Sequence, residues 1–460
     1  MSFKIGRKSR AVHFISLGCA KNRVDTEAML GLLARRGYRQ VANPAEAEVV
    51  VVNTCGFIKP AVRESLAELR KLARDKPRYR YRLIAAGCLV QRLGRELAGL
   101  VSGIDSLIGV HGCQWITRAV SQNGFYVPSR AGLCSPSYFR NRQLTTGPGW
   151  AYLRIADGCN NCCSYCLIPQ IRGPYRSRRI EDVVAEAESL AARGVREINL
   201  IAQDTTSYGI DIYGRRSLGR LLKRLDRIPG IEWIRLLYTH PSHFDEVLIR
   251  ELAEIQHLVR YLDIPLQHIS DRILKSMGRG TDGKSIEALL DKLRRSLPGL
   301  VLRTTLMVGY PGETEEEFAK LLAFVQRTGC ERLGAFVYSP EPGTRAAWLP
   351  GRIPRRLGLR RWHRLMQEQK KVSQRKQRDR IGEEAIVLLE GGIEAEPRSA
   401  GGYEYYGRSP GEAPEVDGRI YLKSKLELYP GQFIKATVVR AGEYDLYGRV
   451  LEERPCRNYF

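Results

Sequence analysis

The sequence predicts an α/β fold in three parts: an open parallel sheet with helices on its faces, a partial parallel barrel, and a small antiparallel β-barrel. In the first part, runs rich in Val and Ile alternate with helix-like segments, which is typical of a covered parallel sheet. In the second part, six strand-like runs are each followed by a helix or a long loop. In the third part, short alternating runs are punctuated by Gly and Pro.

The length and net charge of the chain limit the number of domains and the kinds of partner that we expect. A chain of 460 residues exceeds one ordinary domain, and its net charge of +24 favours capture of polyanionic partners. A generally basic proteome would explain the charge too, but work on or near RNA or a ribonucleoprotein is the sharper interpretation. No apolar run is long enough to span a bilayer, and the basic N-terminus lacks an apolar signal core. We therefore expect a cytoplasmic protein with no membrane contact.

The first part, residues 1–125, repeats one pattern three times. Strand-like runs each lead into a cysteine: 11–17 into Cys19, 48–54 into Cys55, and 82–86 into Cys88. Helix-like segments at 23–36 and 59–74 separate them. Because ligands collect beyond the carboxyl ends of parallel strands, we expect the three thiols to converge there. The alternative is three small residues buried at strand ends, as free Cys commonly is.

A Pro-, Gly- and Ser-containing connector, residues 126–148, leads to the second part, residues 149–380. The strands expected in this part are 152–156, 197–202, 231–238, 261–264, 301–308 and 334–337, and the helices are 180–193, 218–227, 246–258 and 284–297. In such barrels the chemistry lies at the C-terminal ends of the strands. A very basic helical stretch at 350–382 is either a solvated helix face that links domains or a contact surface for RNA.

The third part, residues 381–453, is expected to contain five strands, at 385–389, 403–406, 419–422, 433–439 and 443–450. Small barrels of this kind bind nucleic acid or serve as protein-docking modules.

A cysteine-rich loop follows the first strand of the second part. The stretch D-G-C-N-N-C-C-S-Y-C places Cys159, Cys162, Cys163 and Cys166 within eight residues. A closed zinc site normally draws on two cysteine pairs separated by a longer loop, and a disulfide is disfavoured in a reducing compartment. The third interpretation, beside zinc and a disulfide, is an iron–sulfur cluster held by three of the four thiols. Cys113, Cys134, Cys330 and Cys456 lack a comparable context and are expected to be packing or surface thiols.

The spacing Cys159-x3-Cys163-x2-Cys166 is similar to that of the radical S-adenosylmethionine (SAM) superfamily, and nearly the whole chain resembles a radical SAM methylthiotransferase. The matching motifs are S-L-G-C-A-K-N-R-V-D (16–25), V-N-T-C-G-F-I (52–58), A-A-G-C-L-V-Q-R (85–92), I-P-Q-I-R-G (168–173), D-I-P-L-Q-H (263–268) and V-G-Y-P-G-E-T (308–314). Cys162 departs from the family, which has a basic or polar residue there. The register Cys159-x2-Cys162-x3-Cys166 therefore stays open, although the family spacing favours Cys163.

The resemblance implies a radical SAM barrel, a C-terminal TRAM domain and two 4Fe–4S clusters. Cys159, Cys163 and Cys166 would hold the cluster that binds and cleaves SAM, and Cys19, Cys55 and Cys88 would hold a second cluster that carries the sulfur to be inserted. One SAM would supply a methyl group and another a radical.

SAM contacts are expected from a few side chains near the barrel mouth. Tyr165 would pack near the adenine, and Gln203 and Arg303 would contact the methionyl or ribose groups. The alternative for each residue is ordinary polarity at the mouth of a barrel.

Two subfamilies share this architecture, one acting on an adenosine of tRNA and one on an aspartate of small-subunit ribosomal protein twelve. Three stretches resemble the second subfamily, at residues 16–27, 53–65 and 407–418. The last is acidic, through Glu412, Glu415 and Asp417, and would suit a basic protein better than an RNA backbone. The net charge of +24 would serve tRNA as well.

We therefore predict methylthiolation of an aspartate β-carbon in ribosomal protein twelve, free or on the ribosome, with tRNA as the alternative substrate. A non-catalytic metal-cluster protein that binds RNA is a more distant alternative. The partners expected besides the substrate are an electron-donor protein, a sulfur donor and RNA contacted through the basic surface.

Overall fold

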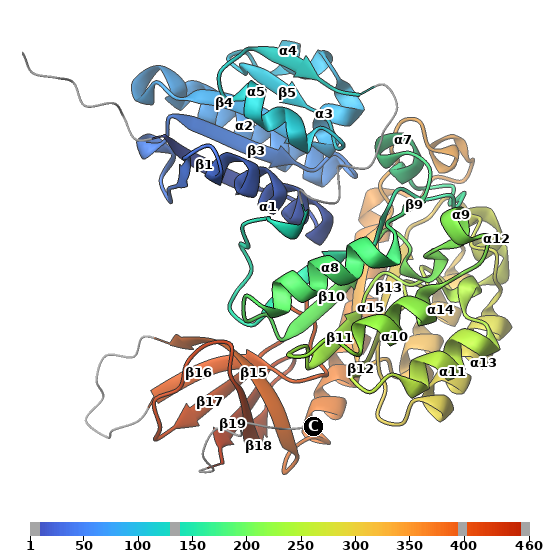
Figure 1. Ribbon diagram of the computed structural model, residues 1–460. Coiled ribbons are helices and arrows are strands. Elements are labelled where there is room, and N and C mark those ends of the chain that lie inside the picture. The colour runs from blue at the N-terminus through green and yellow to red at the C-terminus, as the bar shows by residue number, and fades with distance from the viewer. Residues whose placement is uncertain (1–9, 129–138, 394–402, 452–460) are drawn as a thin grey trace, which may run out of the picture.

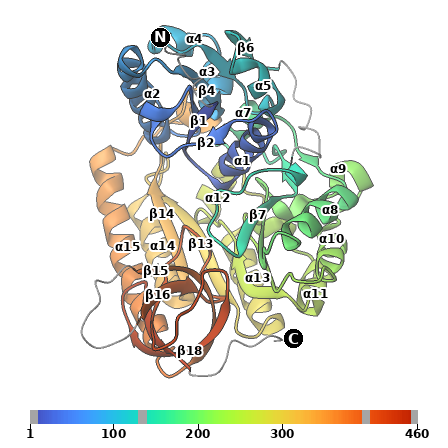
Figure 2. The ribbon, with the colours of Figure 1, turned by 60° about the vertical axis from the view of Figure 1, so that its left-hand side comes forward.

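The computed structural model describes residues 10–128, 139–393 and 403–451 (Figure 1). They form two six-stranded sheets, a closed five-stranded barrel and a two-stranded sheet of β8 (Ala156–Asp157) and β9 (Arg176–Ser177), with their helices. Figure 2 shows the N-terminal sheet and the small C-terminal barrel at opposite ends, with the central strands between them. The segment with Cys134 and the end with Cys456 lie outside the described residues. Within the described ranges, no helix is both long and apolar enough to cross a membrane.

The N-terminal sheet is wholly parallel, with the strand order β2-β1-β3-β4-β5-β6. Its strands are β1 (Ala11–Ser16), β2 (Arg39–Gln40), β3 (Val49–Thr54), β4 (Arg82–Gly87), β5 (Ser106–Ile108) and β6 (Gly124–Tyr126). Helices α1 (Ala20–Ala34) and α2 (Lys59–Tyr79) lie in the expected places, and the short helices α3 (Cys88–Leu93), α4 (Glu96–Leu100) and α5 (Ile116–Ala119) follow. Every residue of β3 is buried, as expected for a central parallel strand covered on both faces.

The central sheet is parallel, with the order β14-β13-β12-β11-β10-β7, and its two edge strands do not pair, so it is a partial barrel. The strands are β7 (Trp150–Arg154), β10 (Glu197–Ile201), β11 (Trp233–Leu236), β12 (Leu258–Asp263), β13 (Val301–Val308) and β14 (Arg332–Val337). All six expected strands are confirmed. The covering helices are α8 (Ile180–Ala191), α10 (Leu218–Leu225), α11 (Glu246–Glu254), α12 (Asp271–Met277), α13 (Gly283–Ser296) and α14 (Glu315–Thr328).

The C-terminal barrel is closed, with the strand order β15-β16-β17-β19-β18. Its strands are β15 (Glu384–Ile393), β16 (Tyr403–Arg408), β17 (Ile420–Ser424), β18 (Phe433–Ala441) and β19 (Leu446–Val450). The expectation of a purely antiparallel barrel needs one correction, because β17 and β19 pair in parallel. The reason is topological: neighbours around a ring of five strands cannot all alternate in direction.

The connector at 126–148 contributes buried side chains that pack between the N-terminal and central parts. Phe139 and Arg142, at the start of its second described stretch, are both buried. The Arg142 guanidinium pairs with Glu27 of α1 and, at 3.0 Å, with Glu186 of α8. Helix α1 lies in the N-terminal part and α8 in the central part, so the Arg142 ion pairs hold the N-terminal sheet against the central barrel.

The basic stretch forms one long helix, α15 (Arg355–Arg378). One face of α15 packs against β14, and near its end the Ser373 hydroxyl and Gln377 amide donate to the backbone carbonyls of Glu443 and Tyr444. The helix therefore links the central barrel to the small one, as the first of the two interpretations expected. An RNA contact from its outer face stays a prediction.

The acidic stretch at 407–418 is not a free surface for a basic partner, and that interpretation was wrong. Glu412 is buried and pairs with Arg332 at 2.7 Å and with Arg380 at 2.8 Å. Glu415 pairs with Arg23 at 2.6 Å, and Asp417 accepts a hydrogen bond from the Tyr261 hydroxyl at 2.6 Å. These carboxylates compensate arginines of the other two parts of the chain and hold the small barrel in place.

Candidate active site

The three N-terminal cysteines lie at one edge of their sheet, as the strand pattern predicts. Cys19 caps the N-terminus of α1, Cys55 directly follows β3, and Cys88 begins α3. Gly18 adopts φ +91°, and a Cβ there would lie 2.8 Å from Cβ of Cys55, so glycine permits this close approach. Burial raises the pKa of the Cys88 thiol to about 12, and repulsion from the nearby Cys19 and Cys55 acts in the same direction.

The loop cysteines follow β7 at the C-terminal mouth of the central barrel. Burial raises the pKa of Cys166 to about 12, and Cys163 and Cys159 are close enough to add to the rise. Cys163 also accepts a hydrogen bond from Arg279 Nη1 at 3.6 Å. Cys162, in contrast, is exposed. The structure thus groups Cys159, Cys163 and Cys166 and leaves Cys162 outside.

All six grouped cysteines are free thiols. In the described parts of the chain, no three Cys, His, Asp or Glu side chains converge as ligands of a single metal ion would. A cubane cluster does not need such convergence, since each thiolate binds a different iron.

The backbone before Cys159 is shaped by a glycine. Gly158 has φ +79°, and a Cβ at this position would overlap the carbonyl oxygen of Pro174. The Cys159 N–H donates to the carbonyl of Gly173 at 3.2 Å, which closes the loop at its base. The I-P-Q-I-R-G stretch, which includes α7 (Ile168–Arg172), therefore sets the position of the first loop cysteine.

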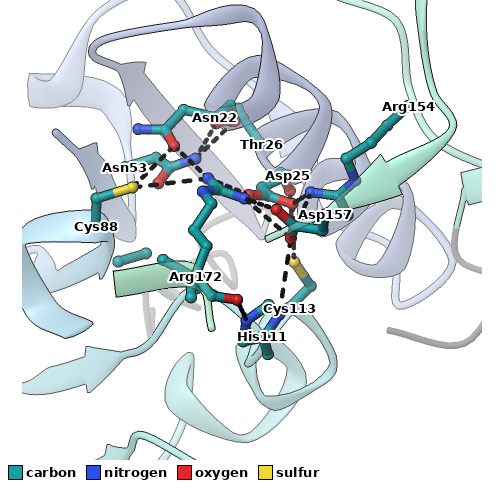
Figure 3. Close-up of polar contacts among 12 residues, drawn as sticks. Asn22, Asp25, Thr26, Asn53, Cys88, His111, Cys113, Arg154, Asp157 and Arg172 are labelled. Atoms are coloured by element: carbon teal, nitrogen blue, oxygen red, sulfur yellow. Dashed lines mark hydrogen bonds and ion pairs between the residues drawn. The ribbon is translucent and has the colours of Figure 1, made fainter. Parts of the chain in front are cut away.

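Arg172 of α7 points towards Asp157 on one side and towards Asn22 and Cys88 of the N-terminal part on the other (Figure 3). It is fully buried, and Nη1 donates to both carboxylate oxygens of Asp157 at 3.1 Å. Its Nη2 reaches the N-terminal part, donating to Asn22 Oδ1 at 2.8 Å and approaching Cys88 Sγ at 3.7 Å. One guanidinium thus joins the base of the cysteine loop to the N-terminal thiols.

Asp157 is the carboxylate at the centre of this junction. Although burial alone would raise its pKa, the Arg172 and Arg154 guanidinium groups hold the pKa well below its usual range. Its Oδ1 also accepts a hydrogen bond from the Gln203 amide at 2.9 Å. The carboxylate is therefore charged and fixes the orientation of both Arg172 and Gln203.

Lys21 lies on the N-terminal side of the same junction. Its side chain is only 6% exposed, and Nζ lies 3.1 Å from the ring centroid of Tyr238, just beyond β11. Burial lowers the pKa of Lys21, and the Cys19 thiolate opposes that shift. Tyr238 is held at φ +59°, and its N–H donates to Asp263 Oδ2 at 3.1 Å.

A cavity of about 770 Å³ opens beside the cysteine loop. Its walls include Tyr165, Gln267, Thr305, Met307 and Phe336 from the central barrel and Phe57 from the N-terminal part. Its size lies within the range typical of small-molecule sites, roughly 300–1,000 Å³.

Of the three predicted SAM contacts, the structure brings only Tyr165 to the wall of this cavity. The Gln203 amide instead donates to Asp157, and Arg303 pairs with Asp263 at 2.9 Å and lies 3.6 Å from Asp417. Their contact with SAM stays a prediction.

Sequence reasoning did not single out Gln267, Arg279, Arg172 or Lys21. Gln267 has φ +73°, and its buried Oε1 has no hydrogen-bond partner among the described residues, so it offers an acceptor at the cavity wall. The motifs D-I-P-L-Q-H, I-P-Q-I-R-G and S-L-G-C-A-K-N contain three of these residues, and that was the available signal. Arg279 lies in none of the quoted motifs.

The partial barrel and its loop thiols define a radical SAM protein, and the comparisons with known proteins agree. The Radical SAM superfamily model matches residues 153–325, the uncharacterized protein family UPF0004 matches 11–109, and the TRAM domain matches 381–451. A solved radical SAM methyltransferase, TsrM from Kitasatospora setae, shares the fold with a TM-score of 0.54 at 18% identity, over 74% of this chain and 77% of that one.

Relatives that match nearly the full length of the chain identify its family within the radical SAM proteins. The ribosomal protein uS12 methylthiotransferase RimO of Acetivibrio thermocellus is 43% identical, over 96% of this chain and 99% of its own. The RimO of Pelotomaculum thermopropionicum is 44% identical, over 98% of this chain and all of its own. The chain belongs to the RimO family of methylthiotransferases.

Proposed function

We propose that the protein inserts a methylthio group at the β-carbon of an aspartate in ribosomal protein uS12. The observation that carries the proposal is the pair of three-cysteine groups linked through the buried Arg172, which contacts Cys88 of one group and Asp157 at the base of the loop that carries the other. Methylthiolation needs both a sulfur carrier and a C–H activating centre, and two adjacent sites of the same donor type suit that pairing. Family membership, and the name that the relatives carry, support the substrate.

The residues present fit the cofactors that this chemistry requires. Cys159, Cys163 and Cys166 would hold one 4Fe–4S cluster, and the N-terminal three cysteines would hold the other; three thiolates leave one iron open for a ligand. The 770 Å³ cavity beside Tyr165 has room for SAM. When bound, these groups supply the electron, the methyl group, the sulfur and the activation of the substrate C–H bond.

The chain's own residues prepare the site. Arg279 donates a hydrogen bond to Cys163, and the Arg172 guanidinium beside Cys88 opposes the rise that burial imposes on the pKa of that thiol. Tyr165 presents an aromatic wall, and Gln267 Oε1 an unused acceptor, to a ligand in the cavity. Arg172, Asp157 and Asn22 are buried, so their contacts are shielded from water.

Several finer expectations belong to the same proposal. The enzyme works in the cytoplasm on free or ribosome-bound uS12 and takes electrons and sulfur from separate donors. RNA would meet the basic surface, including the outer face of α15. The domain boundaries at residues 125, 148 and 380 stay predictions, as does the assignment of Gln203 and Arg303 to SAM.

Anaerobic reconstitution tests the proposal. The expected result is two 4Fe–4S clusters per chain, reductive cleavage of SAM, and a methylthio mass increment on purified uS12 but not on tRNA. Modification of tRNA alone would favour the other subfamily. A colourless zinc protein that does not cleave SAM would contradict the enzymatic proposal altogether.

A further inference from the structure

Lys21 is a buried cation that has no carboxylate of its own, and the main attraction on its charge comes from the Cys19 thiolate two residues away. Its side chain is 6% exposed, and the described residues offer its ammonium no hydrogen-bond acceptor and no ion pair. Its one close partner is the face of Tyr238, 3.1 Å from Nζ. Lysines this deeply buried are almost always paired, because an uncompensated charge is costly to remove from water.

The nearby carboxylates are committed to other cations. Asp263 pairs with Arg303 at 2.9 Å and accepts the Tyr238 N–H, while Asp157 pairs with Arg172 at 3.1 Å. They contribute only longer-range attraction to Lys21. Arg303 and Arg172 are engaged by these carboxylates, whereas Lys21 has neither a hydrogen-bonded nor an ion-paired partner among the described residues.

The position of Lys21 matches what an aspartate substrate needs. It lies two residues from Cys19 and reaches Tyr238, just beyond β11, so its ammonium stands between the N-terminal thiols and the barrel mouth. The β-carbon of an aspartate is bonded directly to its carboxylate carbon. Anchoring that carboxylate therefore holds the reacting carbon one bond away from the anchored group.

We propose that Lys21 binds the side-chain carboxylate of the substrate aspartate and thereby selects aspartate over its uncharged amide. The inference rests on the proposed function and deepens it by assigning the group that reads the substrate's charge. Lys21 donates charge-assisted hydrogen bonds to the carboxylate, and the ring of Tyr238 supports the ammonium from the other side. The substrate carboxylate supplies the hydrogen-bonded anion that the described residues do not offer to Lys21.

The test compares two forms of uS12, one with the target aspartate and one with asparagine in its place. Affinities are measured anaerobically on reconstituted enzyme without reductant, so that binding is read without turnover, and product is measured by mass spectrometry afterwards. Wild-type enzyme is expected to bind the aspartate form about tenfold or more tightly than the asparagine form. Lys21→Gln should lose this preference by weakening only the aspartate form, and Lys21→Arg should keep part of it.

Lys71→Gln, at a surface lysine whose side chain is 61% exposed, is the matched control and should behave as wild type. Equal binding of the two uS12 forms by wild type overturns the inference without any variant. Retained discrimination in Lys21→Gln overturns it as well. So does a loss of iron and sulfide with aspartate binding unchanged, which would make Lys21 a charge partner of the cluster. Absence of any methylthio product with wild type contradicts the proposed function instead.

Discussion

Glu197, the first residue of β10, is the carboxylate that joins the central barrel to the small one. It is fully buried and accepts hydrogen bonds from Arg408 Nη2 at 2.6 Å and from Arg235 Nε at 2.8 Å. Glu197→Gln keeps the shape of the side chain and removes its charge. Two buried guanidinium groups then lose their shared counter-ion.

Breaking a buried ion pair by removing one partner costs about 3–5 kcal/mol. Arg408 keeps a second carboxylate, Glu390, at 2.6 Å, and Arg235 keeps the carbonyl of Pro410 at 2.7 Å. We therefore expect the lower end, about 3 kcal/mol, for Glu197→Gln. Both buried arginines come from or contact the small barrel, so its attachment should weaken first.

The measurement is urea unfolding at pH 7, followed by far-ultraviolet circular dichroism, with limited proteolysis to report release of the small barrel. Glu232→Gln is the matched control, since Glu232 pairs with Arg196 at 2.8 Å near the surface, with side chains 22% and 37% exposed. Such pairs contribute about 1 kcal/mol or less. Equal loss of stability in the two variants would refute the claim that the buried pair fastens the barrels together.

The remaining predictions concern the cysteine loop and a helix cap. Cys162→Ser should keep full iron and sulfide after reconstitution, whereas Cys163→Ser should lose about one cluster per chain; the reverse result would move the register. Gly158→Ala should lower the thermal midpoint far more than Gly194→Ala, because both have positive φ but only at Gly158 would the added methyl group meet backbone atoms; equal shifts would contradict this. Burial alone would raise the pKa of Glu317. Hydrogen bonds donated by Arg272, by the Thr314 N–H and by the Ser270 hydroxyl instead lower it from 4.5 to about 2. Its charge therefore stabilises the fold above pH 4.5. Because Arg272 is largely exposed and solvent screens the pair, Glu317→Gln should cost about 1–2 kcal/mol at pH 7. The difference should shrink as the pH falls towards 2, and a pH-independent loss would disprove this.

Much of the site was predictable because the pattern that carries it is local. Each N-terminal cysteine directly follows a strand-like run, and parallel strands bring their carboxyl ends to one edge, so convergence follows from the order of elements. The strands β2, β5 and β6 were not predicted, because runs of two or three residues carry no measurable period.

The misread acidic stretch shows where local reasoning fails. Glu412 and Asp417 read as surface carboxylates, yet Arg332, Tyr261 and Arg303, from strands far away in the sequence, bury them. The roles of Arg172 and Lys21 could not be predicted from the sequence for the same reason. They depend on which side chains the tertiary structure places beside each residue. The net charge of the chain includes arginines such as Arg332 and Arg303, which form ion pairs with carboxylates inside the protein. It therefore overstates the positive charge that the surface offers to a partner.

The central claim is tested most directly by the masses of ribosomal protein uS12 and of tRNA from cells that lack this chain. The account predicts that uS12 loses one methylthio increment at its target aspartate and regains it when the wild-type chain is restored, but not when Cys163→Ser is. The methylthio content of tRNA should not change. Loss of the increment from tRNA, with uS12 unaltered, would contradict the account.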